Sequence, residues 1–183
     1  MTAPLINHIG ILVPDLEEAI ERWSAATGYS FSPIARYRTD GYSDHSCEVP
    51  HHHDARMSFS LEGDPRIELM EATGEGTHGP AEVGVHHFGF NGVADPASRM
   101  AELAGLGIGA DGVSVDDEGR MLLFFTQKDA LDGVRLEFVS PRRTPVVADD
   151  GSELPDDPAT GRADLWAATR DADGVIRVDG KTV

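Results

Sequence analysis

The organisation of the chain is clearest in the stretch Gly84-Val85-His86-His87-Phe88-Gly89-Phe90, because an earlier segment repeats its pattern. A histidine, an apolar residue, a glycine and a second apolar residue follow one another at His87–Phe90 and, near the N-terminus, at His8–Ile11. A helix start that contains proline and aspartate follows each copy. We therefore expect two modules of similar structure, each beginning with a strand that carries a histidine.

Each module also ends in a strand that carries one glutamate between apolar neighbours. These strands read Ile67-Glu68-Leu69 in the first module and Leu136-Glu137-Phe138 in the second. One histidine and one glutamate per module, at matching places, is the pattern on which the functional interpretation depends.

A helix is predicted between the first two strands of each module. In the first module, Asp15 is suited to cap the free backbone N–H groups, and Glu18 completes a capping-box pattern. Gly28 is placed to end this helix. Asp95-Pro96 begins the second helix, since proline is well tolerated in the first helical turn. The first helix buries apolar residues at helical spacing, namely Leu16, Ile20 and Trp23.

Short runs of alternating apolar residues predict the remaining strands, so that each module has the order βαβββ. The sequence thus predicts an α+β fold in which paired βαβββ modules form a curved mixed sheet. The predicted strands are 5–13, 30–38, 55–61 and 66–72 in module one (5–72), and 83–91, 108–115, 121–126 and 134–139 in module two (83–141).

Three segments lack this periodicity. Residues 73–82 are rich in glycine and polar residues and are predicted to link the modules. Residues 39–54, which contain His51-His52-His53, are predicted to form an irregular polar loop. Residues 142–183 form an acidic tail that is expected to lie on the domain (1–141), to contact a partner subunit, or to be partly disordered.

The composition excludes several classes of function. The formal charge of −17 in 183 residues repels phosphate backbones and anionic lipids, so we expect no nucleic-acid or membrane partner. No apolar run is long enough to span a membrane, and no signal peptide is visible. The single cysteine, Cys47, fits a reducing, cytoplasmic location.

Imidazole and carboxylate together form a ligand set for divalent metals such as Ni, Co, Zn, Mn or Fe. Two modules related by a two-fold axis would bring His8, Glu68, His87 and Glu137 around one point. Strand alternation places a glycine two residues after each histidine on the same face, which leaves space beside the ligand. The sequence therefore predicts one divalent metal ion held by these four residues.

Other residues at these strands compete for the role of ligand. A lone histidine on an apolar strand is more often a hydrogen-bonded core residue than a ligand, and a strand glutamate usually faces solvent; the repeat is what favours ligation. His86 faces away from His87 by alternation and is expected at the surface or beside a ligand. Glu71 has the opposite parity to Glu68, and the triplet 51–53 is expected to be solvated.

With these motifs, the chain resembles the vicinal oxygen chelate superfamily, which includes glyoxalase I, methylmalonyl-CoA epimerase, extradiol dioxygenases and bleomycin-resistance proteins. The resemblance covers residues 5–141 and rests on Asn7–Leu16, Arg66–Leu69, Gly84–Phe90 and Asp132–Val139. It is closest to the glyoxalase and epimerase branch, because His8, Glu68, His87 and Glu137 look like the four ligands of bacterial-type glyoxalase I. Extradiol dioxygenases need no carboxylate at position 68, and the epimerase usually has glutamine there.

The resemblance implies a divalent-metal-dependent isomerase, epimerase or lyase that acts on a small carbonyl substrate through an enediolate. Glu137 is the first choice as catalytic base and Glu68 the second. The alternatives are a non-haem iron dioxygenase of the extradiol type and a small-molecule-binding protein without catalysis. A homodimer is a further expectation of the family.

Overall fold

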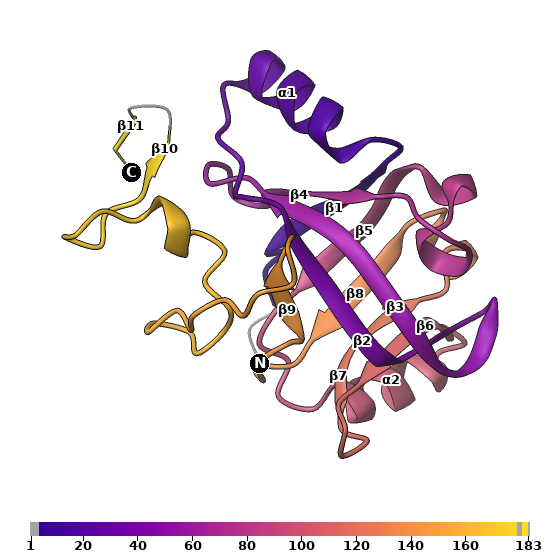
Figure 1. Ribbon diagram of the computed structural model, residues 1–183. Helices are drawn as coiled ribbons and strands as arrows, with labels where there is room; N and C mark the ends of the chain where they lie inside the picture. Colours follow the sequence, from indigo (N-terminus) through magenta and orange to yellow (C-terminus); the bar gives the residue numbers. More distant parts are fainter. Residues whose placement is uncertain (1–3, 179–180, 183) are drawn as a thin grey trace.

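The computed structural model describes residues 4–178 and 181–182, and its centre is a barrel flanked by two helices (Figure 1). Each module has the predicted βαβββ order. Module one consists of β1 (His8–Val13), α1 (Leu16–Thr27), β2 (Ala35–Asp44), β3 (Cys47–Phe59) and β4 (Arg66–Glu71). Module two consists of β5 (Gly84–Phe90), α2 (Pro96–Ala104), β6 (Ala110–Val115), β7 (Met121–Thr126) and β8 (Arg135–Val139). Three short strands follow: β9 (Val146–Ala148), β10 (Arg177–Val178) and β11 (Lys181–Thr182).

The two modules form one nine-stranded sheet with the order β3-β4-β1-β5-β8-β7-β6-β2-β9. Within each module the first and last strands are parallel neighbours, β1 with β4 and β5 with β8. The modules join through the antiparallel pairs β1–β5 and β2–β6. Because β2 also pairs with β3, every strand of the sheet except β9 belongs to a closed ring. The predicted curved mixed sheet is confirmed, and it curves until it closes.

Both helices begin at the predicted aspartates. The Asp15 side chain accepts a 2.8 Å hydrogen bond from the Glu18 backbone N–H, and the Asp95 side chain accepts one from Ser98. Gly28 ends α1 with a φ of 74°, a left-handed conformation that favours glycine. The Glu18 side chain binds Arg22 at 2.7 Å, so it does not complete a capping box.

Apolar side chains fill both surfaces of the barrel wall. Outside, α1 packs on Val13 and Leu69, and α2 packs on Phe124 and Phe138. Inside, there are two apolar clusters, and Tyr37 packs against both. The inner clusters contain Leu12, Ala35, Met57, Met70 and Val146 in one, and Tyr42, Leu123, Phe125 and Val139 in the other.

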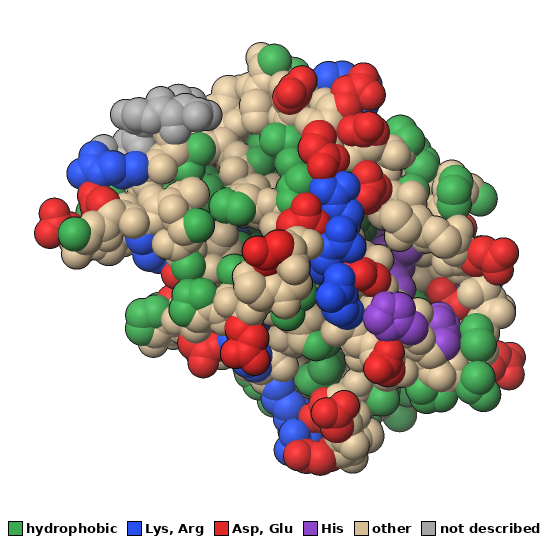
Figure 2. Space-filling model, viewed as in Figure 1, with side chains coloured by type: hydrophobic (Ala, Val, Ile, Leu, Met, Phe, Trp, Pro, Cys, Tyr) green, Lys and Arg blue, Asp and Glu red, His purple; other side chains and the backbone are tan. Residues whose placement is uncertain are grey.

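The prediction that residues 39–54 form an irregular loop is wrong. This segment is most of a long hairpin in which β2 and β3 cross the front of the barrel (Figure 1). On its outer face, Arg36, Arg38 and Arg56 pair with acidic residues, and Figure 2 shows this band of basic side chains flanked by acidic ones. Most residues of this segment are polar, and the β2–β3 register shifts between Thr39 and Tyr42 and again before Asp44, so apolar alternation does not reveal the strands.

The segment 73–82 connects the modules as predicted, but it is not without regular structure. It forms two 3-10 turns, Gly76–His78 and Pro80–Glu82. The first turn buries Thr77 and His78. A polar, glycine-rich linker therefore contributes side chains to the interior of the barrel.

The tail lies on the domain, which is one of the three arrangements considered above. β9 pairs antiparallel with β2, and the rest of the tail continues beside the barrel (Figure 1). Leu154, Ala163 and Leu165 pack against the inner cluster around Leu12, and Trp166 is 5% exposed. The described tail thus closes part of one end of the barrel.

Candidate metal centre

Four side chains from the four central strands converge inside the barrel. His8 Nε2 lies 3.0 Å from His87 Nε2, 3.3 Å from Glu68 Oε2 and 3.1 Å from Glu137 Oε2. His87 Nε2 lies 3.2 Å from Glu68 Oε2 and 3.6 Å from Glu137 Oε2. All four residues are less than 9% exposed. The structure therefore brings together the four residues that the sequence repeat predicts.

These separations fit a common metal ion. Nitrogen and oxygen ligands lie about 2.0–2.2 Å from a divalent ion such as zinc, so neighbouring ligand atoms are about 2.8–3.6 Å apart in octahedral to tetrahedral geometry. His8, His87 and Glu137 offer ligand atoms that all lie within 4.8 Å of one another, and Glu68 faces both imidazoles. Two neutral imidazoles and two carboxylates also balance the charge of a divalent cation. The cluster could hold one such ion.

Each glycine of the repeated motif makes room for the histidine of the other module. β1 and β5 pair so that Gly10 lies opposite His87 and Gly89 lies opposite His8. A Cβ atom on Gly10 would be 2.1 Å from the His87 ring, and one on Gly89 would be 2.0 Å from the His8 ring. The repeated glycines are therefore required for the rings to meet.

Hydrogen bonds from outside the cluster orient both imidazoles. Asn7 Oδ1 accepts a 2.8 Å bond from Asn91 and lies 3.1 Å from His8 Nδ1, so this nitrogen donates to it. His8 Nε2 is thereby directed at the centre. A partner that fixes the imidazole in this way is typical of metal-binding histidines.

His87 is oriented by a chain of two hydrogen bonds. His86 Nε2 lies 2.7 Å from the Thr77 carbonyl, which can only accept, so Nε2 carries the proton. Burial lowers the pKa of His86 well below its usual value, so the ring is neutral and its Nδ1 accepts. This atom lies 2.9 Å from His87 Nδ1, which must donate and leaves Nε2 free to bind.

His86 is therefore not a surface residue. It is 1% exposed, because the strand alternation is broken here: Gly10 lies opposite His87 and Ile11 opposite Val85, so His86 is an extra residue in β5. The 3-10 turn at Gly76–His78 covers this part of β5 and supplies the Thr77 carbonyl. The other expected position of His86, beside a ligand, is the one observed.

The carboxylates dominate the electrostatics of the cluster. Burial alone would lower the pKa of His8, but its hydrogen bonds to Glu137 and Glu68 raise it to about 10. Burial would raise the pKa of Glu68, but hydrogen bonds from His8 and His87 hold it well below its usual range. The two buried carboxylates that face the His8 imidazole therefore favour positive charge at the centre of the cluster.

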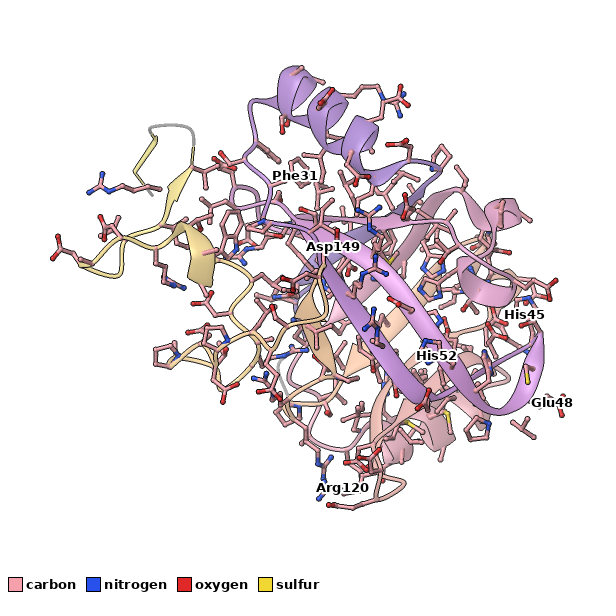
Figure 3. All side chains as sticks on the ribbon, viewed as in Figure 1. Phe31, His45, Glu48, His52, Arg120 and Asp149 are labelled. Carbon is pink, nitrogen blue, oxygen red and sulfur yellow. The ribbon has the colours of Figure 1, made fainter. Side chains whose placement is uncertain are left out.

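A second layer of histidines borders the cluster. His53 stacks on Tyr42 with ring centroids 4.2 Å apart, and His78 lies 4.7 Å from His53 and 5.0 Å from His86. Of the triplet 51–53, His53 thus reaches the interior, contrary to the prediction that all three are solvated. His52 lies on the outer face of β3 and His45 at the end of the hairpin (Figure 3).

A cleft of about 850 Å³ leads to the cluster. His8, Glu68 and Glu137 line it, whereas His87 is fully buried. The opposite wall comes from the tail and includes Arg162 and Trp166. A smaller cavity of about 40 Å³ lies deeper, beside Tyr37 and Tyr42. The volume of the cleft is that of a small-molecule site.

Sequence reasoning identified the cluster but missed most of its surroundings. Tyr37, His78 and Arg162 carry no motif, and the tail lies outside the repeat. Glu71 behaves as predicted, since it binds Arg56 at 2.9 Å outside the cluster. His86 stands next to His87 within the repeated strand, which is the one signal that could have indicated it, whereas His78 lies in the linker and carries no signal.

The closed pair of βαβββ modules, with histidines and glutamates converging inside it, defines the class of fold. The chain belongs to the glyoxalase/bleomycin resistance protein/dioxygenase superfamily, whose family model matches residues 7–109. This confirms the resemblance deduced from the repeated motifs. No curated protein matches the sequence significantly.

Solved structures share the fold at low sequence identity. A hypothetical protein from Bacillus halodurans C-125 is 18% identical, with a TM-score of 0.54 over 78% of this chain and 98% of that chain. Methylmalonyl-CoA epimerase from Mycobacterium tuberculosis is 18% identical, with a TM-score of 0.50 over 78% of this chain and 93% of that chain. These similarities bear on the fold alone.

No helix among residues 4–178 and 181–182 combines the length and the apolar character that crossing a membrane requires.

Proposed function

We propose that the protein is a divalent-metal-dependent isomerase, epimerase or lyase that acts on a small carbonyl compound. The observation that carries the proposal is the convergence of His8, Glu68, His87 and Glu137 within 3.0–3.6 Å at the inner end of the cleft. Both glutamates face this cleft, so a substrate would meet a carboxylate beside the cluster.

A divalent ion held by these residues would act as a Lewis acid and stabilise negative charge on two adjacent substrate oxygens. Ni, Co, Zn, Mn and Fe all accept this ligand set. The buried imidazoles of His8 and His87, each fixed by a hydrogen bond at Nδ1, would supply two rigid ligands. All four side chains are buried inside the barrel, which limits their contact with water.

Glu137 is the proposed base that removes a proton from the substrate carbon next to the carbonyl and returns it. Glu68 Oε2 is almost equally close to both imidazoles, at 3.3 and 3.2 Å, whereas Glu137 Oε2 is 3.1 Å from His8 but 3.6 Å from His87. Glu137 is therefore less tightly held and freer to turn toward a substrate. Glu68 is the second candidate. Such a base contributes about 10²–10⁴-fold to a rate.

The first experiment is the metal content and stoichiometry of the purified protein. We expect one divalent ion per chain, which is lost in a His8→Ala/Glu137→Ala variant and retained in Glu71→Gln. The control removes a glutamate of β4 that binds Arg56 instead of the cluster. A wild-type protein that takes up none of the five metals would overturn the enzymatic proposal and leave a small-molecule-binding protein on the same fold.

A second candidate is a non-haem iron dioxygenase. His8, His87 and Glu137 alone form a group of two histidines and one carboxylate, the ligand set of many iron(II) oxygenases. Glu68 favours the isomerase, because a fourth protein ligand leaves fewer positions for dioxygen and substrate together. Iron in the purified protein and oxygen consumption with catechols would favour the dioxygenase. The expected homodimer remains a prediction, and the cluster is complete within one chain.

A further inference from the structure

Arginine side chains in the described part of the chain almost all pair with acidic residues, as a chain of net charge −17 allows. The same holds for Lys128. Within residues 4–178, the lysine and arginine side chains without an ion pair are Arg66, Arg142 and Arg162, and Arg66 and Arg162 line the cleft. Unpaired guanidinium groups therefore gather where a substrate would bind.

Of Arg66 and Arg162, Arg162 is the better placed to bind a substrate in the cleft. It is half-buried in the wall that the tail contributes, and it acts electrostatically on Glu137, Tyr37 and Glu68. Burial lowers its pKa, and the attraction of Glu137, Tyr37 and Glu68 offsets only part of this effect. The Arg162 guanidinium lines the cleft without an ion pair, so its N–H groups are available to bind an anionic ligand there.

The backbone around Arg162 is fixed on both sides. The Arg162 carbonyl accepts a 2.7 Å hydrogen bond from the Asp157 N–H, and Ala163 packs against the inner apolar cluster. Asp164 is held by Arg170 at 2.7 Å and does not neutralise Arg162. Asp157 likewise binds Ala159 and Thr160. The arginine is thus presented to the cleft by a rigid turn.

Arg66 lies on the wall formed by the barrel. It opens β4, two residues before Glu68 and hence on the same face of the strand. Arg66 pairs in register with His8, and both residues line the cleft. The two arginines and the metal cluster therefore border one space.

We propose that the substrate carries an anionic carboxylate in addition to the two oxygens that face the metal cluster, and that Arg162, assisted by Arg66, binds this carboxylate. Guanidinium groups bind carboxylates through paired hydrogen bonds. A cluster of two glutamates and one divalent ion is neutral, so the arginines supply the positive charge. This inference rests on the proposed function and narrows its substrate class to small carbonyl acids.

Two hydroxamates test the inference without knowledge of the substrate. Acetohydroxamic acid offers two adjacent oxygens to a metal and no further charge, whereas succinohydroxamic acid offers the same oxygens and a carboxylate. Their dissociation constants would be measured by calorimetry on the metal-loaded full chain. The variants are Arg162→Gln, Arg162→Lys, Arg66→Gln and, as a charge-matched control, Arg142→Gln, which removes an unpaired arginine outside the cleft.

We expect the wild-type protein to prefer succinohydroxamic acid by about 10- to 100-fold, the range of a hydrogen-bonded charge pair. Arg162→Gln removes this preference, Arg162→Lys restores part of it, Arg66→Gln reduces it, and Arg142→Gln leaves it unchanged. Acetohydroxamic acid should bind Arg162→Gln within about twofold of wild type.

Absence of a preference in wild type, or its persistence in Arg162→Gln, would overturn the inference. An equal loss for both compounds would also overturn it, because Arg162 would then merely hold the tail in place. Failure of the proposed function is distinct: the protein would take up no metal and acetohydroxamic acid would not bind at all.

Discussion

The imidazole of His87 lies where a side chain on Gly10 would have to be, since a Cβ atom there would be 2.1 Å from the ring. The ring is fully buried and is held by His86, so it has little room to yield. The convergence of the four side chains thus requires a residue without a Cβ atom at position 10 of the neighbouring strand.

Gly10→Ala should displace His87 and lower metal affinity at least about 10-fold, with a loss of roughly 1–3 kcal/mol in the free energy of unfolding. Metal titration and urea unfolding measure the two effects. Gly105→Ala is the control, because its Cβ would be no closer than 3.3 Å to any neighbour. Normal metal binding by Gly10→Ala would show that the rings can move apart.

His86→Phe should weaken metal binding about 10- to 100-fold, because His87 loses the acceptor that directs its Nε2 at the centre. His52→Gln is the matched control, since His52 is exposed and binds Asp40 at 2.7 Å. Competition with a chromogenic chelator reports the affinity. Equal affinities for the two variants would contradict the orientation of His87 by His86.

The free energy of unfolding should fall as the pH is lowered from 6.5 to 4. Burial lowers the pKa of His53 from 6.5 to about 4, so below pH 6.5 the unfolded chain binds a proton that the folded chain does not yet accept. The loss from His53 is at most about 3 kcal/mol.

Urea unfolding of the metal-free protein across this pH range would measure the slope. His53→Gln should flatten it, and His52→Gln should not. An unchanged slope in His53→Gln would assign the acid sensitivity to His78 and His86, whose pKa values burial also lowers.

Asp149→Asn should loosen the attachment of the tail to the barrel. Asp149 lies over β2 and β3 (Figure 3), where it pairs with Arg36 at 2.9 Å and with Arg56 at 3.2 Å. The pairs are partly exposed, so we expect a loss of only about 0.5–1 kcal/mol. Faster hydrogen exchange at β9 would report it. Glu153→Gln, an exposed acid of the same segment, should leave exchange unchanged.

The convergence of His8, Glu68, His87 and Glu137 could be predicted from sequence because the repeat makes these four residues a matched set. Considered alone, neither His8 nor Glu68 can be identified as a ligand from the sequence. His87 and Glu137, however, stand at the same places in the second module. The pairing of β1 with β4 and of β5 with β8 then follows from the βαβββ order. Predictions that rested on this internal comparison agree with the structure.

The surroundings of the cluster could not be predicted, because they depend on contacts between distant segments. The hairpin of β2 and β3 carries polar residues that pair across its outer face, which hides its alternation. Arg162 reaches the cleft only because Ala163 and Leu165 pack against the barrel. No local pattern distinguishes it from the paired arginines of the tail.

His87 occupies the space beside Gly10, and His8 occupies the space beside Gly89. This packing constrains which substitutions each module can accept during evolution. A larger residue in one half removes a ligand that the other half supplies, so neither half can drift independently after duplication. In relatives that lack one of the two histidines, we therefore expect a larger residue at the position of the glycine opposite it. The second histidine–glycine pair should remain unchanged.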